Sequence, residues 1–184
     1  MHGKEFIKIT PMILIVSVYA AVSVLLYIAV RLICRKTAVF RAPSSRAMFY
    51  ILSLTWGSPM VIFGGAVAAV LFIAGHRPVR FGWEWCFELP DIKWGLELGL
   101  FFIAPGNDIR TKIHEHGHGL QNIYFGIFTV PVIFIPSAIR FWYREIREKL
   151  NKPCRNDYDD IWFERSATES GKALIERLGK DKTL

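Results

Sequence analysis

Cysteine is scarce in this chain, and the few cysteines lie far apart. Only Cys34, Cys86 and Cys154 occur in 184 residues, and no two of them form a CxxC pair. An odd number of widely spaced thiols argues against a disulfide framework and against a cysteine-based zinc site. We interpret them as small buried or interfacial side chains.

Acidic side chains are nearly missing from the first part of the chain. Residues 1–46 contain seven Lys and Arg but only one acid, Glu5, whereas residues 76–184 are nearly balanced, with sixteen basic and fifteen acidic side chains. No basic face therefore belongs to the C-terminal part, which argues against nucleic-acid binding. The basic excess, concentrated between Arg31 and Arg46, is typical of a cytoplasmic loop that contacts anionic lipid head groups.

Charge is also missing from two long stretches. Pro11 to Val30 are twenty residues without a charged side chain, and Ala47 to Gly75 are twenty-nine. About 20 helical residues cross a bilayer core of roughly 30 Å, so both stretches are long enough. The first is too long for the apolar core of a cleaved signal peptide, and no small-residue cleavage site precedes a polar mature region. The sequence therefore predicts two transmembrane helices, at about 11–32 and 47–75.

The remaining residues, 76–184, have the length of one small domain. Residues 81–89 and 94–103 alternate loosely between apolar and polar side chains on either side of the turn-like Pro90–Lys93. This pattern predicts a β-hairpin. The chain as a whole is predicted to be a mainly α membrane protein, with an anchor over residues 1–75 and a small α+β zincin-like domain after it.

Helices are expected after the hairpin. Asn107 or Asp108 can cap a helix of about four turns that carries most of the histidines. Residues 123–139 are apolar but contain two prolines, so they are predicted to be a kinked crossing or a membrane-associated segment that enters the interface and returns. Residues 140–152 fit an interfacial helix, and residues 161–178 fit a C-terminal helix.

Three of the five histidines fall within five residues, and they contain the H-E-x-x-H pattern as His114, Glu115 and His118. On a helix, positions i and i+4 lie about 40° apart on one face, so two imidazoles can hold a single Zn²⁺. Glu115 projects to the side, where it can activate a water molecule as a catalytic base. The sequence thus predicts a zinc site with His114 and His118 as ligands.

A catalytic zinc site needs a third protein ligand and an exchangeable water. The best candidate is Glu164 on the C-terminal helix, forty-six residues after His118. The small side chain of Ala167 and the later Gly171 would let the two helices pack closely. The reserve ligands are three aspartates, of which the first and last could instead hold the N–H of a ligating histidine: Asp157, Asp159 and Asp160.

Two other interpretations of the histidine cluster remain open. In an extended strand, His114, His116 and His118 would all point one way and supply three imidazoles, as in cupin-like sites. They could also form a surface cluster without a metal. The flanking apolar residues are spaced as in a helix, which favours the helical interpretation and makes His116 an exposed or outer-shell residue.

Three motifs together carry a family resemblance. They are HEHGHGLQ at 114–121, PSAIRFWYR at 136–144 and DYDDIWFERSAT at 157–168. With the residues between and before them, from about 47 to 171, they resemble a group of small bacterial membrane proteins that are similar to gluzincin-type (HExxH…E) zinc metallopeptidases.

The resemblance implies His114 and His118 as zinc ligands, Glu115 as catalytic base and Glu164 as third ligand. Two better-known zincin patterns do not fit. The Asp-bearing downstream motif of site-two intramembrane proteases is missing, and Tyr124 stands where metzincins have their third histidine.

These observations predict a multi-pass, membrane-anchored, zinc-dependent endopeptidase with a peptide or protein substrate. The alternatives are a catalytically degenerate or structural zinc protein that acts through protein partners, and an accessory protein of metal transport. Glu164 can reach the histidines only if residues 123–139 do not cross completely, or if the site lies within the membrane. With the basic loop inside, the metal domain is expected on the extracytoplasmic face of the bacterial cytoplasmic membrane.

Overall fold

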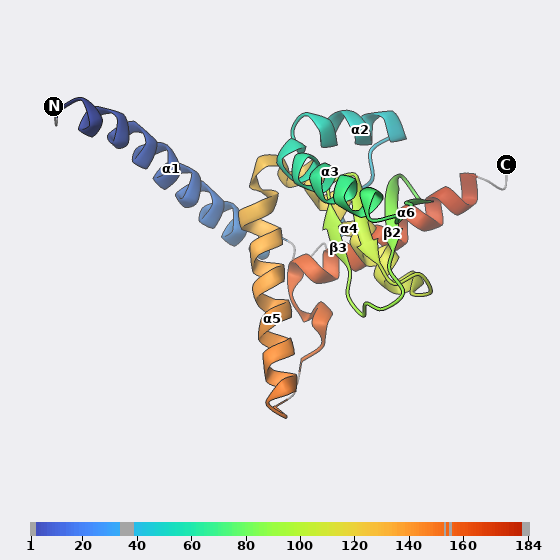
Figure 1. Cartoon of the computed structure of the whole chain (residues 1–184). Coiled ribbons are helices and arrows are strands. Elements are labelled where there is room, and N and C mark those ends of the chain that lie inside the picture. Colours follow the sequence, from blue (N-terminus) through green and yellow to red (C-terminus); the bar gives the residue numbers. More distant parts are fainter. Residues whose placement is uncertain (1–2, 34–38, 153, 155, 182–184) are drawn as a thin grey trace.

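A computed structural model describes residues 3–33, 39–152, 154 and 156–181, and it is mainly helical with one small sheet (Figure 1). The first part contains α1 (Gly3–Ile33), α2 (Arg46–Leu54) and α3 (Ser58–Ile73). The sheet follows, with β1 (Val79–Phe81), β2 (Glu84–Glu88), β3 (Leu96–Leu98) and β4 (Phe101–Ala104). The last part contains α4 (Ile109–Phe125), the short helices η1 (Gly126–Phe128) and η2 (Val130–Phe134), α5 (Ile135–Lys149), η3 (Tyr158–Asp160) and α6 (Trp162–Asp181).

Helix α1 extends away from the rest of the molecule (Figure 1). Its apolar stretch from Pro11 to Ile33 contains an 18-residue window with a mean hydropathy of 2.6. It is the one helix of the described residues that is by itself long and apolar enough to span a membrane. This finding agrees with the first predicted span. It contacts the remainder through Tyr19, whose ring stacks on Phe128, and further along through Leu26, Tyr27 and Val30, which pack against the cluster that contains Trp162.

The second predicted span, at about 47–75, is not one continuous helix, and the structure does not confirm that it crosses a membrane. Helices α2 and α3 meet at an angle of 93°. Pro59 lies in the first turn of α3, where its missing N–H is tolerated, and Gly57 precedes this turn. A Cβ at Gly57 would lie 2.6 Å from the side chain of Asn122, and one at Gly64 would lie 1.8 Å from the carbonyl oxygen of Leu98. The glycines therefore let α2 and α3 pack directly onto α4 and β3.

The sheet is mixed, with the order β1-β2-β4-β3. The predicted hairpin between residues 81–89 and 94–103 does not form, because β2 pairs with β4 in parallel. Each predicted strand instead contains its own hairpin, β1–β2 and β3–β4. Gly82 and Gly99 adopt positive φ angles of 55° and 85° inside the stretches that alternate, and this conformation turns the chain there.

Helix α4 begins as predicted, because the side chain of Asp108 accepts hydrogen bonds from the first backbone N–H groups. The segment after it bends by 119° through η1 and η2, so residues 123–139 do not continue in the direction of α4. Pro131 and Pro136 lie in this segment, where a missing N–H prevents regular α-helical hydrogen bonding. Helix α5 then covers the predicted interfacial helix.

Helices α4 and α6 make the most extensive contact between elements. A Cβ at Gly117 would lie 1.8 Å from the carbonyl oxygen of Ala167, and one at Gly171 would lie 1.9 Å from that of Ile113. The two backbones thus touch where only glycine fits. The predicted close approach of the histidine helix and the C-terminal helix is confirmed.

Candidate metal centre

Three ligand atoms from α4 and α6 converge on one point. The Nε2 atoms of His114 and His118 lie 3.2 Å apart, and they lie 3.0 and 3.2 Å from Oε2 of Glu164. Ligands at roughly 2.0–2.1 Å around a tetrahedral zinc are roughly 3.3 Å apart. The three atoms therefore have nearly the spacing of three corners of such a tetrahedron. This cluster could hold a metal ion.

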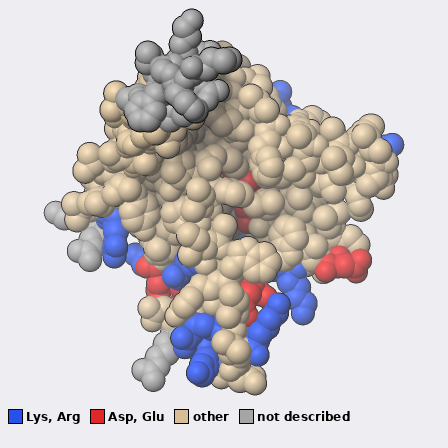
Figure 2. All heavy atoms as spheres, turned by 60° about the vertical axis from the view of Figure 1, so that its left-hand side comes forward, with Lys and Arg blue, Asp and Glu red and all other residues tan. Residues whose placement is uncertain are grey.

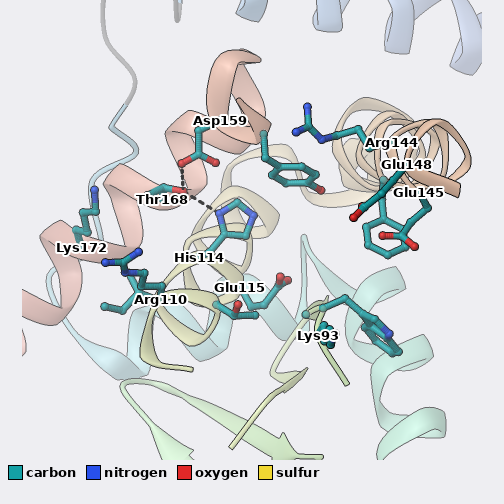
Figure 3. Close-up of a pocket in the computed structure, with 16 residues that line it drawn as sticks. Lys93, Arg110, His114, Glu115, Arg144, Glu145, Glu148, Asp159, Thr168 and Lys172 are labelled. Atoms are coloured by element: carbon teal, nitrogen blue, oxygen red, sulfur yellow. Dashed lines mark hydrogen bonds between the residues drawn. The ribbon is translucent and has the colours of Figure 1, made fainter. Parts of the chain in front are cut away.

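The ring of His114 is held by a short chain of hydrogen bonds, visible as dashed lines in Figure 3. Its Nδ1 lies 2.8 Å from Oγ1 of Thr168, and this hydroxyl donates to Oδ2 of Asp159 over 3.1 Å. Because the Thr168 proton is used by Asp159, the threonine oxygen accepts from Nδ1–H. Nε2 is then the nitrogen that faces the site, where a metal would use its lone pair.

The ring of His118 is held in the same tautomer by a different residue. Its Nδ1 lies 2.7 Å from Oε1 of Gln121. The amide nitrogen of Gln121 donates to the carbonyl oxygen of Phe163, 2.6 Å away, and to the hydroxyl of Ser166. Two acceptors fix the orientation of the amide, so its oxygen accepts from Nδ1–H and Nε2 is again the nitrogen that faces the site.

Glu164 is fully buried and has a partner for each oxygen. Oε2 faces the histidines, while Oε1 accepts a hydrogen bond from the hydroxyl of Ser137 over 2.6 Å. Burial by itself would raise the pKa of Glu164, but the hydrogen bonds from His114 and His118 outweigh it and hold this pKa well below its usual range. The carboxylate is therefore ionised and ready to act as a ligand.

The charge of Glu164 acts in turn on His118. Burial lowers the pKa of the imidazole, but the hydrogen bond and the negative charge of Glu164 outweigh burial and raise this pKa to about 9. Near neutral pH the metal-free site thus shares a proton between these two side chains. A cation would take the place of that proton.

Glu115 lies beside the ligands, between α4 and the beginning of β3. A Cβ at Gly95 would lie 2.3 Å from Oε1 of Glu115, so this approach depends on the glycine. The carboxyl also accepts a hydrogen bond from the backbone of Glu97. Burial raises the pKa of Glu115, although His114 and His118 oppose the shift. A carboxylate with a raised pKa is suited to accept a proton.

Two cavities open beside this site. One, of about 370 Å³, is lined by apolar residues of η2 and α5 together with both candidate histidine ligands. The other, of about 700 Å³, is lined by charged residues, most of them labelled in Figure 3. His114, Glu115 and Tyr158 line both cavities. The candidate site is therefore open to a molecule from outside.

His116 points to the opposite side of α4. It is fully buried, so the expectation of an exposed or outer-shell residue is wrong, and it is not among the atoms that converge. Its Nδ1 contacts Glu84 of β2, and its Nε2 accepts a 3.4 Å hydrogen bond from the backbone N–H of Trp83. The helical geometry also excludes the extended arrangement of three parallel imidazoles.

The three reserve aspartates are not ligands in this structure. Asp157 and Asp160 cap η3 through reciprocal hydrogen bonds, and Asp159 reaches the site only through Thr168. Residue types and spacing did not single out Thr168, Ser137 or Tyr158. Their roles depend on how α5 and η3 fold back onto α6, and no local pattern reports this.

Comparisons with known proteins gave no match to a protein-family model, to a curated protein or to a solved structure.

Proposed function

We propose that this protein is a membrane-anchored, zinc-dependent endopeptidase. The observation that carries the proposal is the set of two imidazoles and one carboxylate with their free atoms directed at one point, next to a glutamate and an open groove. Nitrogen and carboxylate donors in this number suit zinc, and three protein ligands leave a coordination position for water. The predicted resemblance to gluzincin-type metallopeptidases agrees with this donor set but remains a prediction.

His114, His118 and Glu164 would hold the metal. When bound, zinc would polarise the scissile carbonyl and lower the pKa of water. Glu115 would accept a proton from the attacking water, whose oxygen forms a bond to the carbonyl carbon. As the C–N bond breaks, Glu115 would pass this proton to the leaving amine. Thr168, with Asp159 behind it, and Gln121 would keep both imidazoles oriented.

The open groove favours an enzyme over a structural zinc site. In a structural site four protein ligands usually close the coordination sphere. Among the described residues only three ligand atoms converge here, and cavities reach His114, His118 and Glu115. A structural or degenerate site would bind zinc without cleaving peptides, and the comparison of the protein with its Glu115→Gln variant distinguishes it from an enzyme.

We place the metal domain on the face of the basic loop. The backbone N–H of Phe40 donates to Ser170 over 2.7 Å, the hydroxyl of Tyr124 donates to the carbonyl of Arg41 over 2.8 Å, and Arg177 donates to the carbonyl of Pro43 over 2.9 Å. These contacts hold residues 40–43 against α4 and α6. By the positive-inside rule this face is cytoplasmic, in contrast to the extracytoplasmic face expected from the sequence.

The decisive variant is Glu115→Gln in the purified, full-length protein. It keeps the shape of the side chain but removes the base, so we expect about 10²–10⁴-fold slower peptide cleavage with one zinc per chain still bound. Metal analysis and cleavage of a degenerate peptide library measure the two properties. Zinc that is retained by both proteins, with no cleavage by either, would identify a structural site, and equal cleavage by both would refute the role of Glu115.

A further inference from the structure

The two cavities beside the candidate metal centre have opposite chemistry. Trp94, Gly95, His114, Glu115, Phe141 and Tyr158 line both, so the cavities are two arms of one groove that passes the site. One arm continues along Ile133, Phe134, Ala138 and Trp142 and is apolar. The other continues along Lys93, Arg110, Arg144, Glu145 and Lys172 and is charged. A chain in the groove would therefore change from apolar to polar at the metal.

Helix α5 shows where this change lies relative to a membrane. Its exposed side chains are apolar at Ile135, Ile139 and Ile146 and aromatic at Trp142 and Tyr143, and Arg147 and Lys149 lie in its last turn. Exposed Trp and Tyr followed by basic residues are typical of the membrane–water interface. Ser137, which donates to Glu164, precedes Trp142 by five residues, or roughly 7.5 Å along the helix. The metal centre thus lies on the apolar side of the aromatic residues.

Helix α1 gives the same depth independently. The side chains of Leu26, Tyr27 and Val30 pack against the cluster that contains Trp162, two residues before Glu164. Val30 ends the uncharged stretch, and Arg31 begins the basic one. The centre is therefore level with the basic end of the helix that is able to span a membrane.

The surface agrees with this placement. In Figure 2, Lys, Arg, Asp and Glu gather along the lower edge of the molecule, while most of the face above them carries no charge. Acidic atoms are visible at the bottom of a hollow within this uncharged area. The hollow shows that acidic groups are accessible from the part of the surface that lacks Lys, Arg, Asp and Glu.

We propose that the substrate is a membrane-anchored polypeptide, cut where its apolar segment leaves the bilayer for a charged juxtamembrane segment. The apolar arm would take residues still at membrane depth, and the charged arm would take those in water. The first residues of the β3 edge strand, with Trp94 and Gly95 before them, line the groove and could pair with an extended chain. This inference rests on the proposed peptidase function and goes beyond it by naming the substrate class.

The test uses the full-length protein in lipid vesicles with two anchored peptide libraries. Both carry a Leu-rich apolar anchor and a degenerate stretch with charged residues. In one library the stretch follows the anchor directly, and in the other a flexible Gly/Ser linker of about 30 residues separates them, which adds a root-mean-square reach of roughly 30 Å. Both libraries have the same membrane concentration, so only the distance of the stretch from the bilayer differs.

We expect the directly joined library to be cut at least about tenfold faster, with the cuts clustered near the junction. Equal rates would overturn the inference and leave the peptidase function intact. Cleavage of neither library above the level of Glu115→Gln would remove the peptidase function, and the inference with it.

A pair of variants locates the apolar arm. Ala138→Trp places a bulky ring in this arm, whereas Ile139→Trp changes the next residue, which lines neither cavity. We expect Ala138→Trp to slow cleavage of the directly joined library about tenfold, Ile139→Trp to leave it unchanged, and both to keep their zinc. Equal rates for the two variants would show that the substrate does not use this arm.

Discussion

Helix α4 contacts two buried glutamates on its opposite sides, and the two contacts have different properties. Toward α6, the Nε2 atoms of His114 and His118 both lie within hydrogen-bond distance of one oxygen of Glu164, and no other side chain among the described residues uses them. Toward the sheet, His116 contacts Glu84 and also accepts from the backbone of Trp83, so both of its ring nitrogens are used within the protein. The first group borders a groove, whereas His116 and Glu84 are fully sealed.

The comparison shows what separates a candidate ligand histidine from a structural one. Burial lowers the pKa of His116 to about 3, with a smaller contribution from Arg80, so this ring is neutral. Burial also raises the pKa of Glu84 well above its usual range. That pair is therefore a neutral hydrogen-bonded contact, while the Glu164 group carries charge. A histidine–glutamate contact alone does not indicate a metal site. Two imidazole nitrogens that converge on one ionised carboxylate, with their Nδ1 atoms held by other residues, are what a metal site needs.

The same substitution on both sides of α4 gives the sharpest test of this difference. Glu164→Gln removes the charge of a candidate ligand. We expect zinc affinity to fall by about 10²–10³-fold, because one of four ligands contributes roughly one quarter of the binding free energy of a four-coordinate site. Glu84→Gln replaces a neutral acid by an amide of the same shape. We expect it to keep its zinc and to lose only about 1 kcal/mol of stability.

Zinc titration against a competing chelator and thermal unfolding measure both variants. If Glu84→Gln released zinc as completely as Glu164→Gln, the division of α4 into a metal side and a structural side would be wrong.

Gly117 tests how closely the metal side depends on the contact between the helices. Gly117→Ala would force its methyl group against the carbonyl oxygen of Ala167, and Ala167 follows Glu164 by one turn of α6. We expect a loss of about 1–3 kcal/mol of stability, as for overpacked cores, and weaker zinc binding because α6 must move. Gly65→Ala is the control, since a Cβ there meets nothing within 4 Å. Unchanged zinc affinity in a destabilised Gly117→Ala protein would show that the ligands adapt to this movement.

Thr168 tests the hydrogen bond behind a ligand. Thr168→Val keeps the shape of the side chain but leaves Nδ1–H of His114 without its acceptor, whereas Thr168→Ser keeps the hydroxyl. Loss of such a partner usually costs 10–100-fold in metal affinity or activity. We expect Thr168→Val to bind zinc about tenfold more weakly and Thr168→Ser to bind it normally in a chelator competition. Equal affinities would mean that packing alone orients the ring.

The sequence predicted the candidate metal centre better than it predicted the fold around it. H-E-x-x-H fixes two ligands through helical geometry, and the small residues after Glu164 indicated that a second helix could come close. These are local features. The pairing of β2 with β4 was missed because alternation identifies a strand but not its neighbour, and the turns at Gly82 and Gly99 lay inside the alternating stretches.

The break between α2 and α3 in the second predicted span was missed for a related reason. Composition measures how apolar residues 47–75 are, but it does not report that Gly57 and Gly64 fit against Asn122 and Leu98. The role of His116 also depends on a partner distant in sequence, Glu84. This partner becomes visible only when the sheet is placed against α4, whereas Glu164 could be predicted from its place on the C-terminal helix.

A proton on the metal side of α4 should make zinc binding depend on pH. The raised pKa of His118, about 9, means that the metal-free site holds one proton between pH 7 and 8.5, which zinc must displace. Apparent zinc affinity should therefore rise about tenfold per pH unit in this range and level off above pH 9. His116, with its pKa of about 3, is neutral throughout and adds no slope.

Zinc titrations in chelator buffers at several pH values measure the slope. Glu84→Gln, which changes only the structural side, should leave it at one proton per zinc. A flat profile between pH 7 and 8.5 would mean that Glu164 does not hold a proton on His118, and the contrast between the charged and the neutral side of α4 would then be lost.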